Sequence, residues 1–167
     1  MNRRSWLLAA ALLVTLVAGC GKKDSDESGA GSTAAPFPTA ATLGDQVVLT
    51  AAEYLATEPY ASANRSRGER QAMLCKACHS LTKGGQNMIG PALYGFIGTR
   101  VGAREGFEYS AVMRNADFVW TPAALDAWLA QPGRFLPGNR MTFAGVPDQK
   151  DRADLIAYLI EATTSDR

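Results

Sequence analysis

The chain has 167 residues, of which 47% are hydrophobic and 20% are charged, and its formal net charge is +1. This length suits one domain of about 100–200 residues with a tether. The near-neutral charge lacks the basic excess that is typical of nucleic-acid-binding domains, so no nucleic-acid partner is expected.

The N-terminus is typical of an exported protein. Two arginines precede an apolar run over residues 6–17, which predicts a signal peptide over residues 1–19. The segment Val17-Ala18-Gly19-Cys20 resembles a bacterial lipobox, which implies that Cys20 is the lipidated first residue of the mature protein. The alternative is an uncleaved transmembrane anchor, but an apolar run of about a dozen residues is short for a bilayer span, which needs ~20.

Residues 20–46 are rich in Gly, Ser, Ala, Thr, Pro and charged residues. Such a composition cannot bury a core, so it predicts a flexible linker with an r.m.s. span of ~25–30 Å. Residues 47–65 carry a short apolar pattern before Pro59, which predicts a brief amphipathic helix in an N-terminal extension. This extension either packs on the following domain or docks a partner.

Residues 66–167 form the predicted main domain, which is all-α because helical patterns alternate with Gly/Pro-rich loops. Thr121 is a candidate N-cap for a helix that runs through Ala130 and that Pro132 is expected to stop. Asp148 favours the start of a last helix, whose apolar side packs inward.

The run Cys75-Lys76-Ala77-Cys78-His79, in a helix expected over residues 68–79, is the attachment signature of c-type haem. On a helix, positions i, i+3 and i+4 share one face, so both thiols and the imidazole point the same way. The thiols of Cys75 and Cys78 can form thioethers with the two vinyl groups of one porphyrin. His79 then lies beside the iron as an axial ligand.

The alternatives for this motif are a thioredoxin-like dithiol and half of a zinc site. A dithiol of that kind sits beside a βαβ pattern, and a zinc site needs four ligands. Outside the motif the sequence has only one other cysteine, Cys20, and no other histidine. Neither alternative meets its requirement, so one covalently bound haem c is the predicted cofactor.

The lone histidine excludes a second imidazole ligand from this chain, so methionine is the candidate for the sixth position. Met73 lies in the haem-bearing helix and Met113 in a predicted short helix, so both are set aside. Met88 follows His79 by only nine residues, which makes wrapping to the opposite face awkward. Met141 lies in a loop before the last helix, and we predict His79 and Met141 as the metal ligands. Core filling is the alternative for any methionine.

Residues 66–165 resemble a class I cytochrome c of the mitochondrial-like bacterial type, here in a membrane-anchored lipoprotein form. The order and spacing of several stretches carry the resemblance, which implies the class I cytochrome c fold, with helices wrapped around one haem. Besides the haem motif, these stretches are Gly90-Pro91-Ala92-Leu93-Tyr94-Gly95, Pro137-Gly138-Asn139-Arg140-Met141, and residues 106–110, 142–145 and 154–159.

This resemblance implies roles for further residues around the haem. The carbonyl of Pro91 would accept the ring N–H of His79 and fix its tautomer. Tyr109 and Trp120 would donate to a buried propionate, with ordinary aromatic packing as the alternative. Phe143 would shield the distal edge.

The sequence departs from the family pattern at several places. The family usually carries arginine where this chain has Thr99, so the arginine that pairs with a propionate is absent or displaced to Arg100. Trp128 replaces a tyrosine whose hydroxyl commonly hydrogen-bonds the methionine ligand, and its indole N–H is the candidate replacement. The lysines around the haem edge are also thinned, so electrostatic steering of a partner should be weaker.

A six-coordinate iron leaves no open position for a substrate, so the sequence predicts a one-electron carrier and not an enzyme. The expected partners are membrane redox complexes, with a quinol-oxidising complex or dehydrogenase as donor and a terminal oxidase as acceptor. The alternatives are a fixed haem subunit of a larger redox enzyme or a sensor, and a haem peroxidase, which needs an open iron site. We expect a monomer in the bacterial periplasmic space, held to a membrane by its lipid.

Overall fold

The structure is a computed structural model that describes residues 39–44 and 46–164. The predicted signal peptide, Cys20 and most of the predicted linker lie outside the described residues. Between residues 46 and 164 no strand is present, and only an isolated antiparallel bridge joins Arg100 to Val119. The predicted all-α class is therefore confirmed. In chain order, the helices are the 3-10 helix η1 (Ala40–Thr42), α1 (Ala51–Leu55), α2 (Arg65–Lys76), α3 (Ala111–Asn115), α4 (Pro122–Ala130), α5 (Pro132–Phe135) and α6 (Gln149–Thr163).

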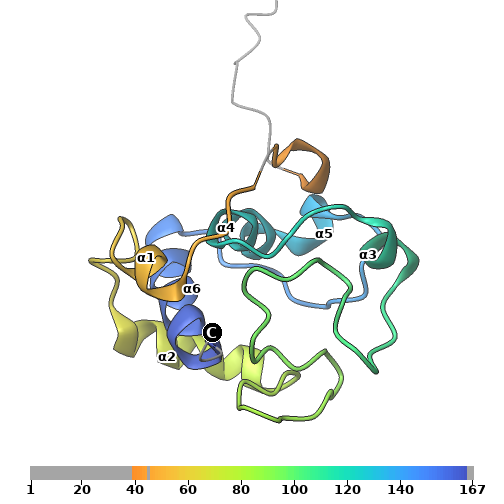
Figure 1. Cartoon of the computed structure of the whole chain (residues 1–167), viewed down its shortest axis with the longest axis horizontal. Coiled ribbons are helices and arrows are strands. Elements are labelled where there is room, and N and C mark those ends of the chain that lie inside the picture. The colour runs from red at the N-terminus through yellow and green to blue at the C-terminus, as the bar shows by residue number, and fades with distance from the viewer. Residues whose placement is uncertain (1–38, 45, 165–167) are drawn as a thin grey trace, which may run out of the picture. The chain divides into compact units, whose positions relative to one another are not determined.

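The crossing of α2 and α6 is the main helix contact of the domain (Figure 1). A Cβ atom built on Gly68 would lie 2.1 Å from the carbonyl oxygen of Asp154, so only glycine permits this approach. Asp154 is fully buried, and its Oδ1 accepts from the backbone N–H of Asn64 at 2.7 Å. The start of α2 is thus fixed to the middle of α6.

The haem-bearing helix differs from its predicted bounds at both ends. It begins at Arg65, because the side chain of Asn64 caps it by accepting from the Arg67 N–H at 3.0 Å. It ends at Lys76, and His79 lies in the following turn, where its N–H still donates to the Cys75 carbonyl oxygen at 2.9 Å. The last predicted positions therefore keep a helix-like turn without belonging to the helix.

The predicted caps of the two later helices are confirmed. The Thr121 hydroxyl accepts from the Ala124 N–H at 3.2 Å, and Asp148 accepts from the Asp151 N–H at 2.8 Å. Pro132 does end α4, but it also opens the short helix α5, which the sequence analysis missed. Proline suits a first helical position because its fixed φ is already helical and no partner is needed for an N–H there.

The segment before α2 packs on the domain. The Gln46 amide donates to the Val119 carbonyl oxygen at 2.8 Å and accepts from the Val119 N–H at 2.7 Å, although composition placed Gln46 in the linker. In α1 the buried Tyr54 accepts from the Leu49 N–H at 2.9 Å and donates to the Val47 carbonyl oxygen at 3.1 Å. In the part of the chain that is described, no helix combines the length and apolar character that a membrane span requires.

Candidate functional site: a cavity beside the haem motif

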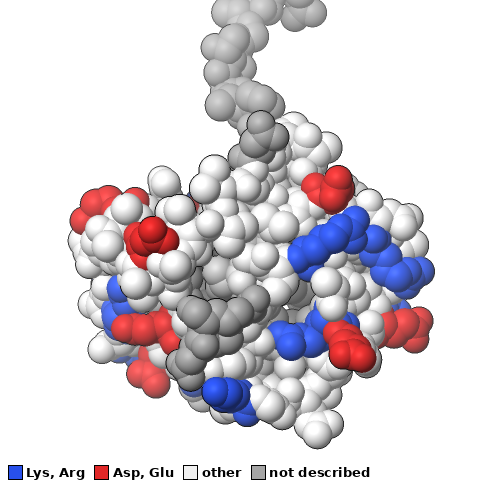
Figure 2. All heavy atoms as spheres, viewed as in Figure 1, with Lys and Arg blue, Asp and Glu red and all other residues white. Residues whose placement is uncertain are grey.

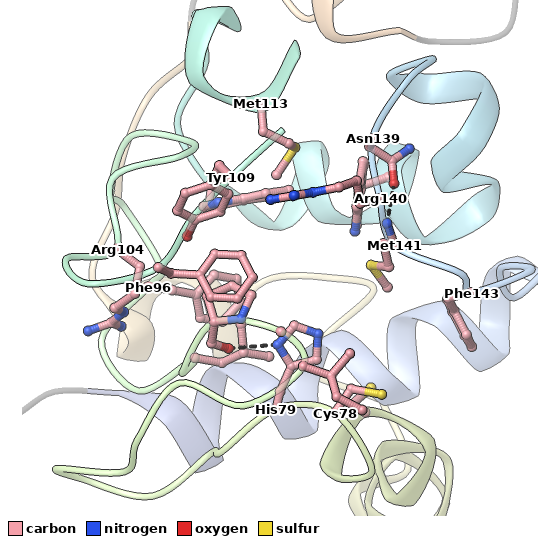
Figure 3. A pocket seen from close by; sticks show the side chains of 18 of the residues that line it. Cys78, His79, Phe96, Arg104, Tyr109, Met113, Asn139, Arg140, Met141 and Phe143 are labelled. Carbon is pink, nitrogen blue, oxygen red and sulfur yellow. Dashed lines mark hydrogen bonds between the residues drawn. The ribbon is translucent and has the colours of Figure 1, made fainter. Parts of the chain in front are cut away.

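The end of α2, the loops after it and the loop after α5 enclose a cavity of about 990 Å³ (Figure 3). Its wall is built from segments far apart in the sequence, mostly apolar side chains with a few polar groups. The predicted haem residues that the structure describes all line this cavity: Cys75, Cys78, His79, Pro91, Arg100, Tyr109, Trp120, Trp128, Met141 and Phe143.

His79 is oriented by the backbone of the loop that follows it. Its Nδ1 lies 2.7 Å from the Pro91 carbonyl oxygen, which can only accept, so Nδ1 carries the proton and Nε2 keeps its lone pair. Burial lowers the pKa of the imidazole, against the opposing effect of the bond to Pro91. A Cβ on Gly90 would lie 2.2 Å from the imidazole Cε1, so this glycine lets the backbone pass against the ring.

Both motif cysteines lie at the cavity wall, and neither forms a disulfide. Burial raises the pKa of the Cys75 thiol to about 11, so this group is protonated near neutral pH. Figure 3 shows Cys78 beside His79, and the turn after α2 presents both to the cavity. The thiols and the imidazole thus meet at one wall.

Met141 enters the cavity from the loop after α5. The Asn139 amide donates to the carbonyl oxygens of Pro132 and Leu136 at 3.0 and 2.9 Å, and its oxygen accepts from the Met141 N–H at 2.9 Å. This side chain fixes the loop, and Figure 3 shows the Met141 side chain directed into the cavity toward His79. Met88, by contrast, is exposed and does not line the cavity.

The loop after Met141 is held from behind by Arg152 of α6. The guanidinium donates to the carbonyl oxygens of Val146 and Pro147 at 3.0 and 2.8 Å, and its Nε lies 2.8 Å from the Asp126 carboxylate in α4. The side chain of Arg152 is 10% exposed. The position of Met141 therefore rests on α4 and α6 as well as on its own loop.

A second thioether lies in the cavity. Met113 of α3 lines it, and its sulfur points inward (Figure 3). The sequence analysis set this residue aside because a position in a short helix gives no sign of facing a distant histidine. The sequence would have indicated that Met113 lines the cavity only if other cavity residues had lain on the same face of this helix.

The polar side chains at one end of the cavity lie around Tyr109. Burial raises the pKa of its phenol, while the backbone and the positive charge of Arg104 act in the opposite direction. The neighbouring Ser110 hydroxyl lines the cavity, is buried and has no hydrogen-bond partner in the described part of the chain. A buried hydroxyl without a partner favours a ligand that brings an acceptor to this point.

Trp120 and Trp128 belong to an aromatic cluster against the cavity. Their ring centroids are 5.7 Å apart with edge-to-face geometry, and Trp128 also packs against Phe135 at 5.9 Å. Trp128 is buried, and both tryptophans line the cavity.

Arg100 occupies a more exposed position than its predicted role requires. Its Nε lies 3.7 Å from the Asp117 carboxylate, and its side chain is 50% exposed. The neighbouring Thr99 hydroxyl donates to the Phe96 carbonyl oxygen at 2.6 Å. Neither residue places a buried cation in the cavity.

The donor set as a whole fits a covalently bound haem. The cavity offers two thiols, an imidazole with a free Nε2, two thioethers and an apolar wall. Its polar end offers an unpartnered hydroxyl, which suits a carboxylate of such a cofactor. We find no feature of the cavity that conflicts with this group.

Comparison with known proteins gives related chains, although no family model matches. The chain is 44% identical over 99 residues to a cytochrome c homolog from Bradyrhizobium diazoefficiens, over 59% of this chain and 54% of that protein. It is 35% identical over 119 residues to cytochrome c2 from Rhodomicrobium vannielii, over 71% of this chain and 90% of that protein. Cytochrome cH from Methylobacterium extorquens matches in structure with a TM-score of 0.54 and 37% identity, over 58% of this chain and 97% of that chain.

Proposed function

The chain belongs to the class I cytochrome c family, and from this premise we propose that it is a one-electron carrier in which His79 and Met141 would bind the haem iron. Cytochromes c carry electrons and are not enzymes, and their haem c is covalently bound. The observation that carries the proposal is a cavity in which an imidazole and a thioether face each other beside two thiols.

When bound, the haem supplies a reversible one-electron couple at its iron. Cys75 and Cys78 would hold it by thioether bonds. His79 would present Nε2, since Pro91 keeps the proton on Nδ1. Met141 would present a soft sulfur ligand, which raises the reduction potential in cytochromes c.

The rest of the cavity would tune the couple and exclude water. Its apolar wall, including Phe143 and the buried Trp128, limits solvent access, and this favours the less charged ferrous state. Tyr109 and Trp120 would donate to a carboxylate at the polar end, as buried tyrosine and tryptophan usually find polar partners.

The membrane side of the proposal rests on the sequence outside the described residues. Lipidation of Cys20 would tether the carrier in the periplasmic space, and the linker predicted from the composition of residues 20–46 would give the domain its reach. A tether raises the effective concentration near membrane redox complexes, which are the proposed donor and acceptor. We propose that the carrier is a monomer.

The experiment is spectroscopy on the purified protein with its haem attached. We expect a low-spin spectrum in both oxidation states, a long-wavelength thioether-to-ferric band, and a reversible one-electron potentiometric titration. A high-spin ferric spectrum in the wild-type protein would contradict the carrier and favour an enzyme with an open iron position. A six-coordinate spectrum without the thioether band would contradict methionine ligation.

A further inference from the structure

The charged side chains that line the cavity differ in how deeply they lie. They are Arg100, Arg104, Glu105, Glu108 and Arg140. Both glutamates, Arg100 and Arg140 are exposed, whereas Arg104 is half-buried. Arg104 is therefore the most enclosed cation of the cavity wall.

Two contacts hold Arg104 at the polar end. Its guanidinium donates to the Tyr94 carbonyl oxygen, and its backbone and charge act on the Tyr109 phenol. Figure 3 shows Arg104 and Tyr109 together at the side of the cavity away from Phe143. A guanidinium has five N–H donors, so one bond to Tyr94 leaves several for a second acceptor.

The other arginines have different roles in the structure. Arg100 pairs with Asp117 at the surface, with Nε and Oδ1 3.7 Å apart. Arg140 donates to the carbonyl oxygen of Glu108 and so joins two loops across the rim. Among the arginines of the cavity wall, Arg104 alone combines partial burial with the neighbourhood of the Tyr109 phenol. The unpartnered Ser110 hydroxyl follows Tyr109 directly in the chain and lines the same cavity.

We propose that Arg104, and not Arg100, is the cation that neutralises a haem carboxylate in this chain. This inference rests on the proposed function, because the carboxylate comes with the haem. An ionised carboxylate in an apolar cavity is costly unless a cation and hydrogen-bond donors meet it. Arg104 would supply the charge and the neighbouring Tyr109 a neutral donor, and the Ser110 hydroxyl of the cavity wall would supply a second donor.

The test is the reduction potential of the haem-loaded protein as a function of pH. In Arg104→Gln the potential at pH 7 falls, because removal of a positive charge favours the ferric state. The carboxylate also binds its proton more easily, so the pH at which the potential changes rises by about 1–3 units. Arg104→Lys keeps the charge and restores most of both effects.

Arg114→Gln is the matched control, because Arg114 also donates to a backbone carbonyl, that of Tyr109, but is exposed and lies outside the cavity wall. It should leave the potential and its pH dependence unchanged. The proposal is overturned if Arg104→Gln moves neither quantity, or if Arg100→Gln reproduces both shifts. Should Arg104→Gln fail to fold, an Arg104→Lys protein with the potential of the wild type supports the charge role, and one with a strongly lowered potential contradicts it.

The proposed function has a separate readout in the same samples. A low-spin spectrum with the thioether band in the wild type supports the carrier whatever Arg104 does. If Arg104→Gln keeps that spectrum and its potential does not change, the proposed role of Arg104 is refuted and the proposed carrier function is not.

Discussion

Two thioethers face the cavity, and the proposal that Met141 is the ligand predicts different outcomes for their removal. Met141→Ala should abolish the long-wavelength thioether band and lower the reduction potential, because a soft ligand that favours ferrous iron is lost. Met113→Ala should keep the band. It should lower the free energy of unfolding by about 2–4 kcal/mol, because it removes a partly buried methionine side chain. Absorption spectra and denaturant titrations of both variants measure this. Retention of the band in Met141→Ala and its loss in Met113→Ala would exchange the two assignments.

The haem motif and the family resemblance were the two sources of the predicted haem residues. All of those that lie in the described part of the chain line the cavity. Met113, Arg104 and Ser110 also line the cavity, but the sequence does not predict this, because their positions depend on loops that fold back over long sequence distances. Ser110 follows Tyr109 directly, and this adjacency was the only available signal. Arg100 is the sequence candidate for pairing with a propionate because it directly follows Thr99. The greater burial of Arg104 becomes visible only in the three-dimensional structure.

At the scale of elements, the crossing of α2 and α6 depends on one glycine. Gly68→Ala places a Cβ atom 2.1 Å from the Asp154 carbonyl oxygen, so the helices must separate. We expect a loss of about 1–3 kcal/mol in the free energy of unfolding, measured by urea titration. Gly133→Ala in α5 is the control, since nothing lies within 4 Å of its Cβ. This control should change stability by less than about 1 kcal/mol. Equal effects of the two changes would contradict the packing argument.

The same glycine explains why the start of α2 was predicted too late. The predicted helix begins at Gly68, and glycine is a residue that disfavours helix interiors. The structure places it inside α2, because the Asn64 cap and the packing on α6 outweigh its low propensity. Local signals did suffice for α4 and α6, where Thr121 and Asp148 cap the helices directly.

The guanidinium of Arg152 connects α6 to α4 and to the loop that follows Met141. Loss of this guanidinium should therefore loosen the Met141 loop. Arg152→Met leaves the Asp126 carboxylate and two backbone carbonyls without their donors, which should cost about 2–4 kcal/mol. The loop should also loosen, so exogenous imidazole should displace the thioether at lower concentration than in the wild type. Arg152→Lys keeps the charge without the fork and should show intermediate effects. An unchanged imidazole titration in Arg152→Met would show that α6 does not hold the Met141 loop.

At the scale of the whole molecule, charge offers little guidance to a partner. The formal net charge is +1, and Figure 2 shows basic and acidic side chains mixed on the visible face, with the basic ones gathered where α3 and α5 lie. Long-range steering grows with the size and separation of charge, so it should be modest here. If long-range steering is modest, a tether or close-range packing must bring the haem near its redox partner, because electron transfer requires a short distance between them.

A lipid on Cys20 would provide that tether, and its effect can be separated from the haem domain. In the wild type, we expect the mass of the intact protein to correspond to residues 20–167 with haem and acyl chains. A variant with a cleavable signal that lacks Cys20 should have the same spectrum and potential. At equal bulk concentration it should reduce or oxidise native membranes more slowly, and on the order of 10²-fold more protein should be needed to match the tethered form. An unmodified Cys20, or retention of residues 1–19, would contradict lipidation. Equal rates for both forms would instead show that the partner binds the domain itself, as a fixed subunit does.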